Sequence, residues 1–143
     1  FALNLHGPPS DVHFYIGFAP AKLCRLRKTA MTFYTNRFIS KNSAGCTRGP
    51  VIFIRPQYRD DEGLLRHEQT HRKQWLMSLG LHSFLYLLSK KYRLWAEVQA
   101  YKEQLRYPPA NGQEAYVDLY AGFITRNYGL SITVEEAKDK LRR

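Results

Sequence analysis

Cysteine is scarce in this chain, with two residues in 143. Cys24 and Cys46 lack the CxxC spacing of a redox or metal-binding pair, and free thiols are favoured over a disulfide between them. Long apolar runs are also missing. The longest candidate, from Leu79 to Leu88, is interrupted by Gly80 and His82 and is shorter than the roughly 20 residues that cross a bilayer. The sequence therefore predicts neither a disulfide-stapled scaffold nor a membrane-spanning helix.

Acidic residues are the minority charge, with 12 Asp and Glu against 22 Lys and Arg, which gives a formal net charge of +10. Such an excess favours polyanions or acidic protein surfaces as partners. The basic residues are nevertheless spread along the whole chain, and no nucleic-acid-binding motif accompanies them. Two interpretations stay open: a solvated basic surface, or a site for nucleic acid or an acidic protein surface.

Apolar and aromatic residues are abundant enough for a folded core, at 44% and 14% of the chain. The length is that of one ordinary domain, so residues 1–143 are expected to form a single unit. The first ten residues contain Gly7, Pro8 and Pro9 together and are expected to form an N-terminal arm.

The expected elements change character along the chain. Short β-rich runs predict strands at 12–18, 31–39 and 51–55, the last two forming a hairpin across a turn region at 40–50. Helical periodicity and end signals then predict helices at 62–79, 83–107 and 113–128, with a short last helix after the Thr133/Glu136 capping box. Strands first and helices after indicate an α+β fold.

The stretch with the most chemical information is the HExxH sequence from His67 to His71. On a helix, two histidines four residues apart project from one face and can share a tetrahedral ion. Glu68 lies beside that face, within reach of a zinc-bound water, as a general base requires. The alternative is a chance match on an exposed, charged helix that also carries Arg66 and Arg72.

A hydrolytic zinc normally has three protein ligands, so the two histidines need a third. A third histidine six residues after His71 is excluded because that position is Met77. His82 would serve only if the chain turned back sharply. Glu97, 26 residues after His71 on the next predicted helix, is the favoured ligand, and Glu103 is the fallback.

The alternative for Glu97 is a solvated acid paired with Arg93 or Tyr101. Its neighbours Trp95 and Val98 are expected to face the core, which favours a buried carboxylate. An acid on a half-buried face needs a partner, and a cation is a suitable one.

A strand, an HExxH helix and a following helix with a glutamate, over about Val51 to Arg106, resemble the gluzincin branch of the zincin metallopeptidases. The small size resembles the minimal forms found in short bacterial and bacteriophage proteins. The resemblance implies a zincin-like fold, with a small N-terminal sheet, an active helix and a helical C-terminal half. It implies one Zn²⁺ per chain held by His67, His71 and Glu97, with Glu68 as general base and acid in hydrolysis of a peptide bond.

The resemblance also implies how a peptide or protein substrate binds: the edge of strand 51–55 would accept it as an extra strand, unless that strand is an ordinary core strand. Tyr120 and Tyr128 are candidates for stabilising the oxyanion, with aromatic packing as the alternative role. Several gluzincins have an Asp where this chain has Tyr101. A cytoplasmic or virion-associated location is favoured over secretion. The rival functions are a structural component of a larger assembly, such as a virion, and a basic polyanion-binding module.

Overall fold

The computed structural model describes residues 31–107 and 112–143. The expected arm at 1–10, the expected strand at 12–18 and Cys24 lie outside these residues. Within them, a three-stranded sheet precedes five α-helices, so the predicted α+β class is confirmed, with helix predominating. None of the described helices is both long and apolar enough to span a bilayer.

The sheet has the strand order β1-β3-β2, built from β1 (Thr32–Tyr34), β2 (Gly45–Arg48) and β3 (Val51–Ile54). β3 pairs in parallel with β1 and antiparallel with β2. The predicted hairpin between 31–39 and 51–55 is therefore wrong. The true hairpin joins β2 to β3 through Gly49, whose positive φ of 61° favours glycine.

Strand β2 falls inside the region 40–50, which was expected to be a turn because Gly45 and Gly49 favour turns. The buried side chains of Cys46 and Thr47 fix this segment against the rest of the fold. The loop before it is held by Arg55, whose guanidinium donates to the carbonyl oxygens of Ser43 and Ser40 at 2.7 and 3.0 Å. Long-range contacts of this kind leave no periodic signal in the sequence.

Helix α1 (Glu62–Met77) agrees with the predicted helix to within two residues. Asp61 is its N-cap, and its carboxylate accepts a hydrogen bond from the Leu64 amide at 2.8 Å. The helix ends where Leu79 and Gly80 adopt positive φ values of 52° and 87°. The helix-end signals in the sequence were therefore sufficient to predict this helix.

The single helix expected at 83–107 is wrong, since α2 (His82–Leu88) and α3 (Lys90–Gln104) replace it. Ser89 between them is extended, and its hydroxyl caps α3 by accepting from the Tyr92 amide at 3.2 Å. Arg93 donates to the carbonyl oxygens of Tyr86 and Leu87, which satisfies the exposed end of α2. The break costs little because both helix ends find partners.

The prediction that Trp95 and Val98 face the core is also only partly correct. Val98 and Leu105 are buried, whereas Trp95 is 49% exposed and does not face the core. Phe84 and the leucines at the end of α2 are exposed as well. The break at Ser89 changes the helical phase, so residues before it no longer share a face with those after it.

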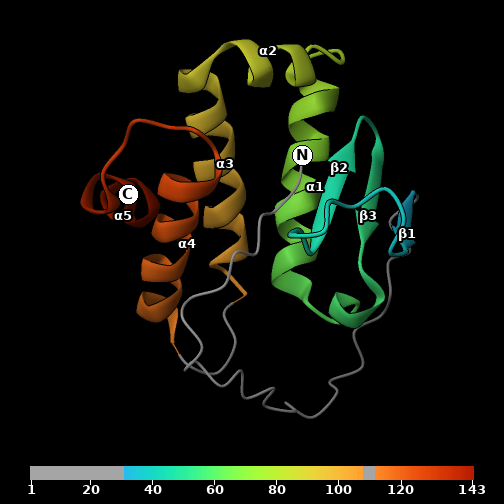
Figure 1. Cartoon of the computed structure of the whole chain (residues 1–143), viewed down its shortest axis with the longest axis horizontal. Coiled ribbons are helices and arrows are strands. Elements are labelled where there is room, and N and C mark those ends of the chain that lie inside the picture. The colour runs from blue at the N-terminus through green and yellow to red at the C-terminus, as the bar shows by residue number, and fades with distance from the viewer. Residues whose placement is uncertain (1–30, 108–111) are drawn as a thin grey trace.

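Helices α4 (Gln113–Asn127) and α5 (Val134–Arg142) complete the described chain. The Thr133/Glu136 capping box is formed as predicted, and Gly129 after α4 has a φ of 62°. Figure 1 shows α1 and α3 side by side, with the sheet against α1 and with α4 and α5 on the other side of α3. Helix α2 lies across the ends of α1 and α3. The α1/α3 pair is therefore the centre of the molecule.

Candidate metal centre

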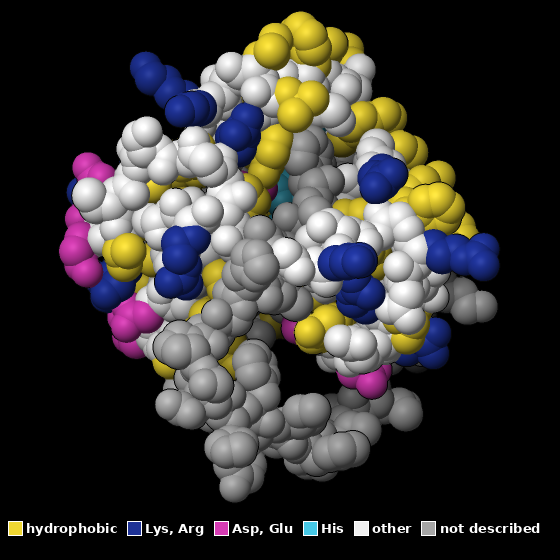
Figure 2. Space-filling view, viewed as in Figure 1, with side chains coloured by type: hydrophobic (Ala, Val, Ile, Leu, Met, Phe, Trp, Pro, Cys, Tyr) yellow, Lys and Arg dark blue, Asp and Glu magenta, His cyan; other side chains and the backbone are white. Residues whose placement is uncertain are grey.

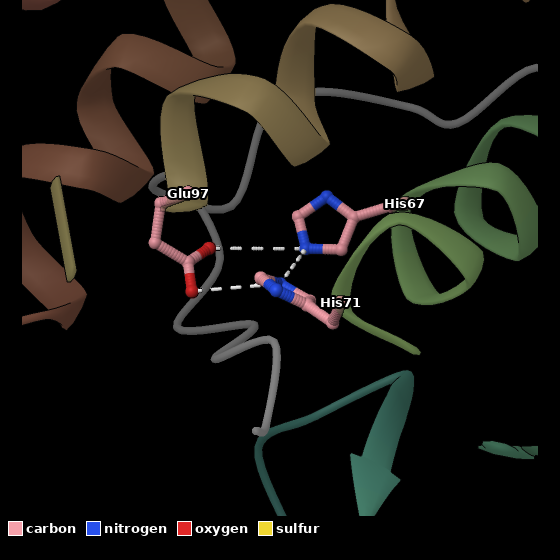
Figure 3. Close-up of side chains that lie close together, drawn as sticks. All are labelled: His67, His71 and Glu97. Carbon is pink, nitrogen blue, oxygen red and sulfur yellow. Dashed lines mark hydrogen bonds and ion pairs between the residues drawn. The ribbon is translucent and has the colours of Figure 1, made fainter. Parts of the chain in front are cut away.

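The three predicted ligands meet between α1 and α3. His67 and His71 project from α1 toward Glu97 of α3, and one donor atom from each lies within 4.8 Å of the others (Figure 3). All three residues are at most 1% exposed. Figure 2 shows a histidine side chain at the bottom of a hollow between the helical half and the sheet half of the molecule. Residues 26 positions apart in sequence thus form one compact cluster.

The spacing of the donor atoms suits a small tetrahedral cation. Zinc–nitrogen distances of about 2.0–2.1 Å place two ligand nitrogens of a tetrahedral site roughly 3.3 Å apart. The Nε2 atoms of His67 and His71 are 3.1 Å apart. Glu97 Oε2 lies 3.8 Å from His67 Nε2, and Glu97 Oε1 lies 3.5 Å from His71 Nε2. Two imidazoles and one carboxylate are also a donor set that catalytic zinc uses.

A glutamine fixes the orientation of His71. The Nδ1 atom of His71 lies 3.0 Å from Gln74 Oε1, and Gln74 Nε2 donates to the Ala96 carbonyl at 3.1 Å. Because the Gln74 amide nitrogen is used by Ala96, its oxygen faces the imidazole and accepts the Nδ1 proton. The Nε2 atom of His71 therefore carries the lone pair, and it lies inside the cluster, 3.1 Å from His67 Nε2 and 3.5 Å from Glu97 Oε1.

The Glu97 carboxylate is held from one side. Tyr86 donates its hydroxyl proton to Glu97 Oε1 at 2.5 Å. The other oxygen, Oε2, is buried and makes no hydrogen bond within the part of the chain that the structure describes. A buried carboxylate oxygen without a donor is costly unless a cation compensates it. A cation held by the cluster would compensate this atom.

The protonation of the cluster agrees with metal binding. Burial lowers the pKa of His67 to about 3 and places that of His71 well below its usual range, so both imidazoles are neutral near pH 7. Burial raises the pKa of Glu97 to about 7. The pKa of Glu68 is likewise raised to about 7, by burial first and by the charge of Glu97 as a smaller cause.

Glu68 lies next to the cluster and is held by the sheet. Its Oε2 atom accepts a hydrogen bond from the Thr47 hydroxyl at 2.7 Å, and both side chains are buried. Gly45 allows β2 to approach this closely, because a Cβ atom there would lie 3.2 Å from Glu68 Oε1. The sheet thus positions the group expected to be the general base.

The other candidates from the sequence lie elsewhere. Met77 is 75% exposed, and Glu103 pairs with Arg106 at 3.1 Å. The chain does turn back after α1, so His82 is buried with its ring centroid 5.9 Å from that of His71. However, its Nδ1 atom lies 2.9 Å from the Tyr92 hydroxyl, and His82 is not among the clustered donors.

The tyrosines considered for the oxyanion or for ligand support are packed behind the cluster. Tyr101 sets its ring edge-on to His67, with centroids 4.6 Å apart, and its hydroxyl lies 2.9 Å from that of Tyr128. Tyr120 stacks on Tyr101 at 4.8 Å. This supports aromatic packing for Tyr120.

The strand expected to offer its edge to a peptide does not have a free edge. Strand β3, which contains most of the predicted 51–55 strand, is the middle strand and is paired on both sides. That expectation is wrong for β3. Among the described residues, the end strand next to α1 is β2, which also carries Thr47.

Sequence patterns did not reveal Thr47, Gln74 and Tyr86. Gln74 had a usable signal, since it lies three residues after His71 on the same helix and therefore on the same face. Thr47 and Tyr86 are 21 and 11 residues from the glutamates that they bond. Only tertiary folding brings them into place.

Comparison of the chain with protein-family models, with curated proteins and with solved structures finds no match. The interpretation of the site therefore depends on its geometry and on the HExxH motif.

Zinc binding should release a proton below neutral pH. In the metal-free protein, Glu97 is protonated below about pH 7, whereas the imidazoles remain neutral to much lower pH. Glutamate binds a metal ion in its carboxylate form, so zinc should displace the Glu97 proton, and zinc affinity should fall as the pH decreases. In a Glu68→Gln background, calorimetry at about pH 6 in buffers of different ionisation enthalpy should find about one proton released per zinc. Affinity that does not change between about pH 5 and 7 would contradict the assigned ligand.

Proposed function

We propose that this protein is a zinc-dependent peptidase of the zincin type, in the gluzincin branch. The observation that carries the proposal is the convergence of His67, His71 and Glu97 beside a buried glutamate that directly follows the first histidine. A strand, an HExxH helix and an antiparallel helix with the third ligand are the arrangement that the resemblance implies. The cluster has three donors among the described residues, which favours an open catalytic site over a closed structural one.

His67, His71 and Glu97 would hold the ion, and hydrogen bonds orient two of them. Gln74 sets the tautomer of His71, and Tyr86 holds one oxygen of Glu97. Zinc, when bound, supplies a Lewis acid that lowers the pKa of water and polarises a carbonyl group. The protein supplies a dry environment, since the donors are buried, and this strengthens every electrostatic interaction there.

Glu68 would accept a proton from the attacking water and later give it to the leaving amine. Thr47 occupies Oε2, so we assign the proton to Oε1, the oxygen that Thr47 does not engage. Burial raises the pKa of the Glu68 carboxyl, so this group binds a proton more tightly than an exposed glutamate does. The hydrogen bond from Thr47 restricts the rotation of the carboxyl group, which keeps Oε1 in place through both transfers.

The substrate would bind as an extended chain along β2. The Ala44 carbonyl accepts a hydrogen bond from the Arg55 amide. Backbone groups alternate in direction along an antiparallel strand, so in the β2–β3 register those of Gly45 and Thr47 point away from β3. An extended peptide would add on this outer side of β2, the end strand of the described sheet. A peptide there would lie next to the strand that positions Glu68, so the scissile bond would be close to the base.

Cleavage of a peptide library tests the proposal. The zinc-loaded protein should cut peptide bonds, a chelator should stop cleavage, and added zinc should restore it. His67→Ala is the control for a contaminating protease, because it removes a proposed ligand and should be inactive. Folded, zinc-loaded protein that cuts no peptide would refute the proposed function, as would cleavage that persists both with chelator and in His67→Ala.

A further inference from the structure

One end of the molecule carries a cluster of protruding apolar side chains, which we call the apolar cap. It comes from the end of α1, the following turn and α2. Six of its members are each at least 60% exposed: Met77, Leu79, Leu81, Phe84, Leu87 and Leu88. Figure 2 shows hydrophobic side chains gathered at the top of the molecule, over α2. Single exposed apolar residues are ordinary, but a contiguous group of this kind marks an interaction surface.

The apolar cap lies at one extremity of the fold. Helix α2 lies across the ends of α1 and α3 and forms the outer end of the molecule (Figure 1). The turn before it has two consecutive residues with positive φ, Leu79 and Gly80, and the Leu79 side chain is 93% exposed. A left-handed leucine costs energy, so the turn presents an apolar side chain outward at a conformational cost.

The segment of the chain that forms the apolar cap carries charges of one sign. From residue 69 to residue 96 the chain contains no Asp or Glu, whereas it contains five basic residues. Three of them, Lys73, Lys90 and Lys91, are exposed. The two adjacent lysines begin α3 directly after the apolar end of α2. The net charge of +10 likewise makes the protein as a whole positively charged.

Two aromatic residues complete the rim. Trp95 is 49% exposed and lies with its ring centroid 5.3 Å from that of Tyr92. Tryptophan and tyrosine are enriched where an apolar phase meets water, because each has an apolar body and a polar group. Lysine, in contrast, is depleted in protein–protein interfaces. Leucines surrounded by lysines and an exposed tryptophan are typical of surfaces that dock on lipid.

We propose that the apolar cap docks the protein on the surface of an anionic lipid bilayer. The leucines and Phe84 enter the boundary between headgroups and acyl chains, while Lys90 and Lys91 contact anionic headgroups. The opposite face of α2 contributes His82 and Tyr86 to the interior, and Tyr86 holds Glu97. Docking therefore places the candidate metal centre close to the bilayer. The proposal does not depend on zinc or on hydrolysis.

Vesicle sedimentation of the full chain tests it. The protein should sediment with vesicles that mix phosphatidylcholine and phosphatidylglycerol, and much less with pure phosphatidylcholine. Leu87→Gln with Leu88→Gln should weaken binding by at least about tenfold, since two exposed leucines no longer enter the bilayer. Lys90→Gln with Lys91→Gln should weaken it by about fivefold for each lysine and reduce its salt dependence.

The matched control is Val134→Gln with Lys140→Gln, an exposed apolar and basic pair on α5 that should bind like the wild type. Circular dichroism confirms that each variant is folded. Two outcomes would overturn the proposal. One is no sedimentation of the folded wild type with either vesicle. The other is a wild-type dimer in light scattering that becomes monomeric in the leucine variant, with vesicle binding unchanged, because the apolar cap would then be a contact between two copies.

Discussion

Glu68→Gln should retain the fold and the zinc but lose hydrolysis, with the catalytic rate lowered by roughly 10²–10⁴-fold. The amide keeps the size of the side chain and still accepts the Thr47 hydroxyl through its oxygen. It cannot accept a proton, so the attacking water loses its base. Single-turnover cleavage of a validated peptide measures the rate, and a chelating dye measures the zinc in the same sample.

Glu136→Gln is a control for general effects of removing a carboxylate, because Glu136 caps α5 far from the cluster. It should cleave at the wild-type rate. Wild-type cleavage by Glu68→Gln would show that another group moves the proton. Loss of zinc from Glu68→Gln would instead show that Glu68 is a ligand and not a base.

Glu97→Gln should lower the affinity for zinc by more than about 100-fold, which exceeds the usual effect of losing a group that only orients a ligand. The amide keeps the volume and still accepts the hydrogen bond from Tyr86, so the fold should survive. It lacks the negative charge that stabilises the cation in a buried site. Competition with a chelating dye measures the affinity.

Glu103→Gln is the matched control, since Glu103 is on the same helix but pairs with Arg106 near the surface. Its zinc affinity should equal that of the wild type. Equal affinities for Glu97→Gln and the wild type, or a large loss in Glu103→Gln, would overturn the assignment of Glu97. The HExxH histidines would remain as ligands in either case.

The helical half of the fold was largely predictable because its signals are local. Asp61, Gly80 and the Thr133/Glu136 box act through bonds within a few residues, and each lies at a helix end. The sheet was less predictable. Pairing between β1 and β3 joins residues about 20 positions apart, and no local pattern encodes it.

The residues of the site also divide into those that local sequence signals predict and those that they do not. His67, Glu68 and His71 are placed by helical periodicity alone, and Glu97 followed from the need for a third donor on the returning helix. The break at Ser89 left this placement intact, because α3 still runs beside α1 from Lys90 onward. The groups that hold the ligands, Tyr86 and Thr47, depend on side-chain contacts between elements and could not be inferred.

Measuring the zinc content of the folded chain tests the central claim most directly. Protein purified without chelator, or dialysed against zinc and then freed of excess metal, should contain about one zinc per chain. X-ray absorption should show nitrogen and oxygen donors at about 2.0–2.2 Å and no sulfur. His67→Ala with His71→Ala should contain almost none. A folded wild-type protein that holds no zinc after dialysis, or as little as the double variant, would contradict the account.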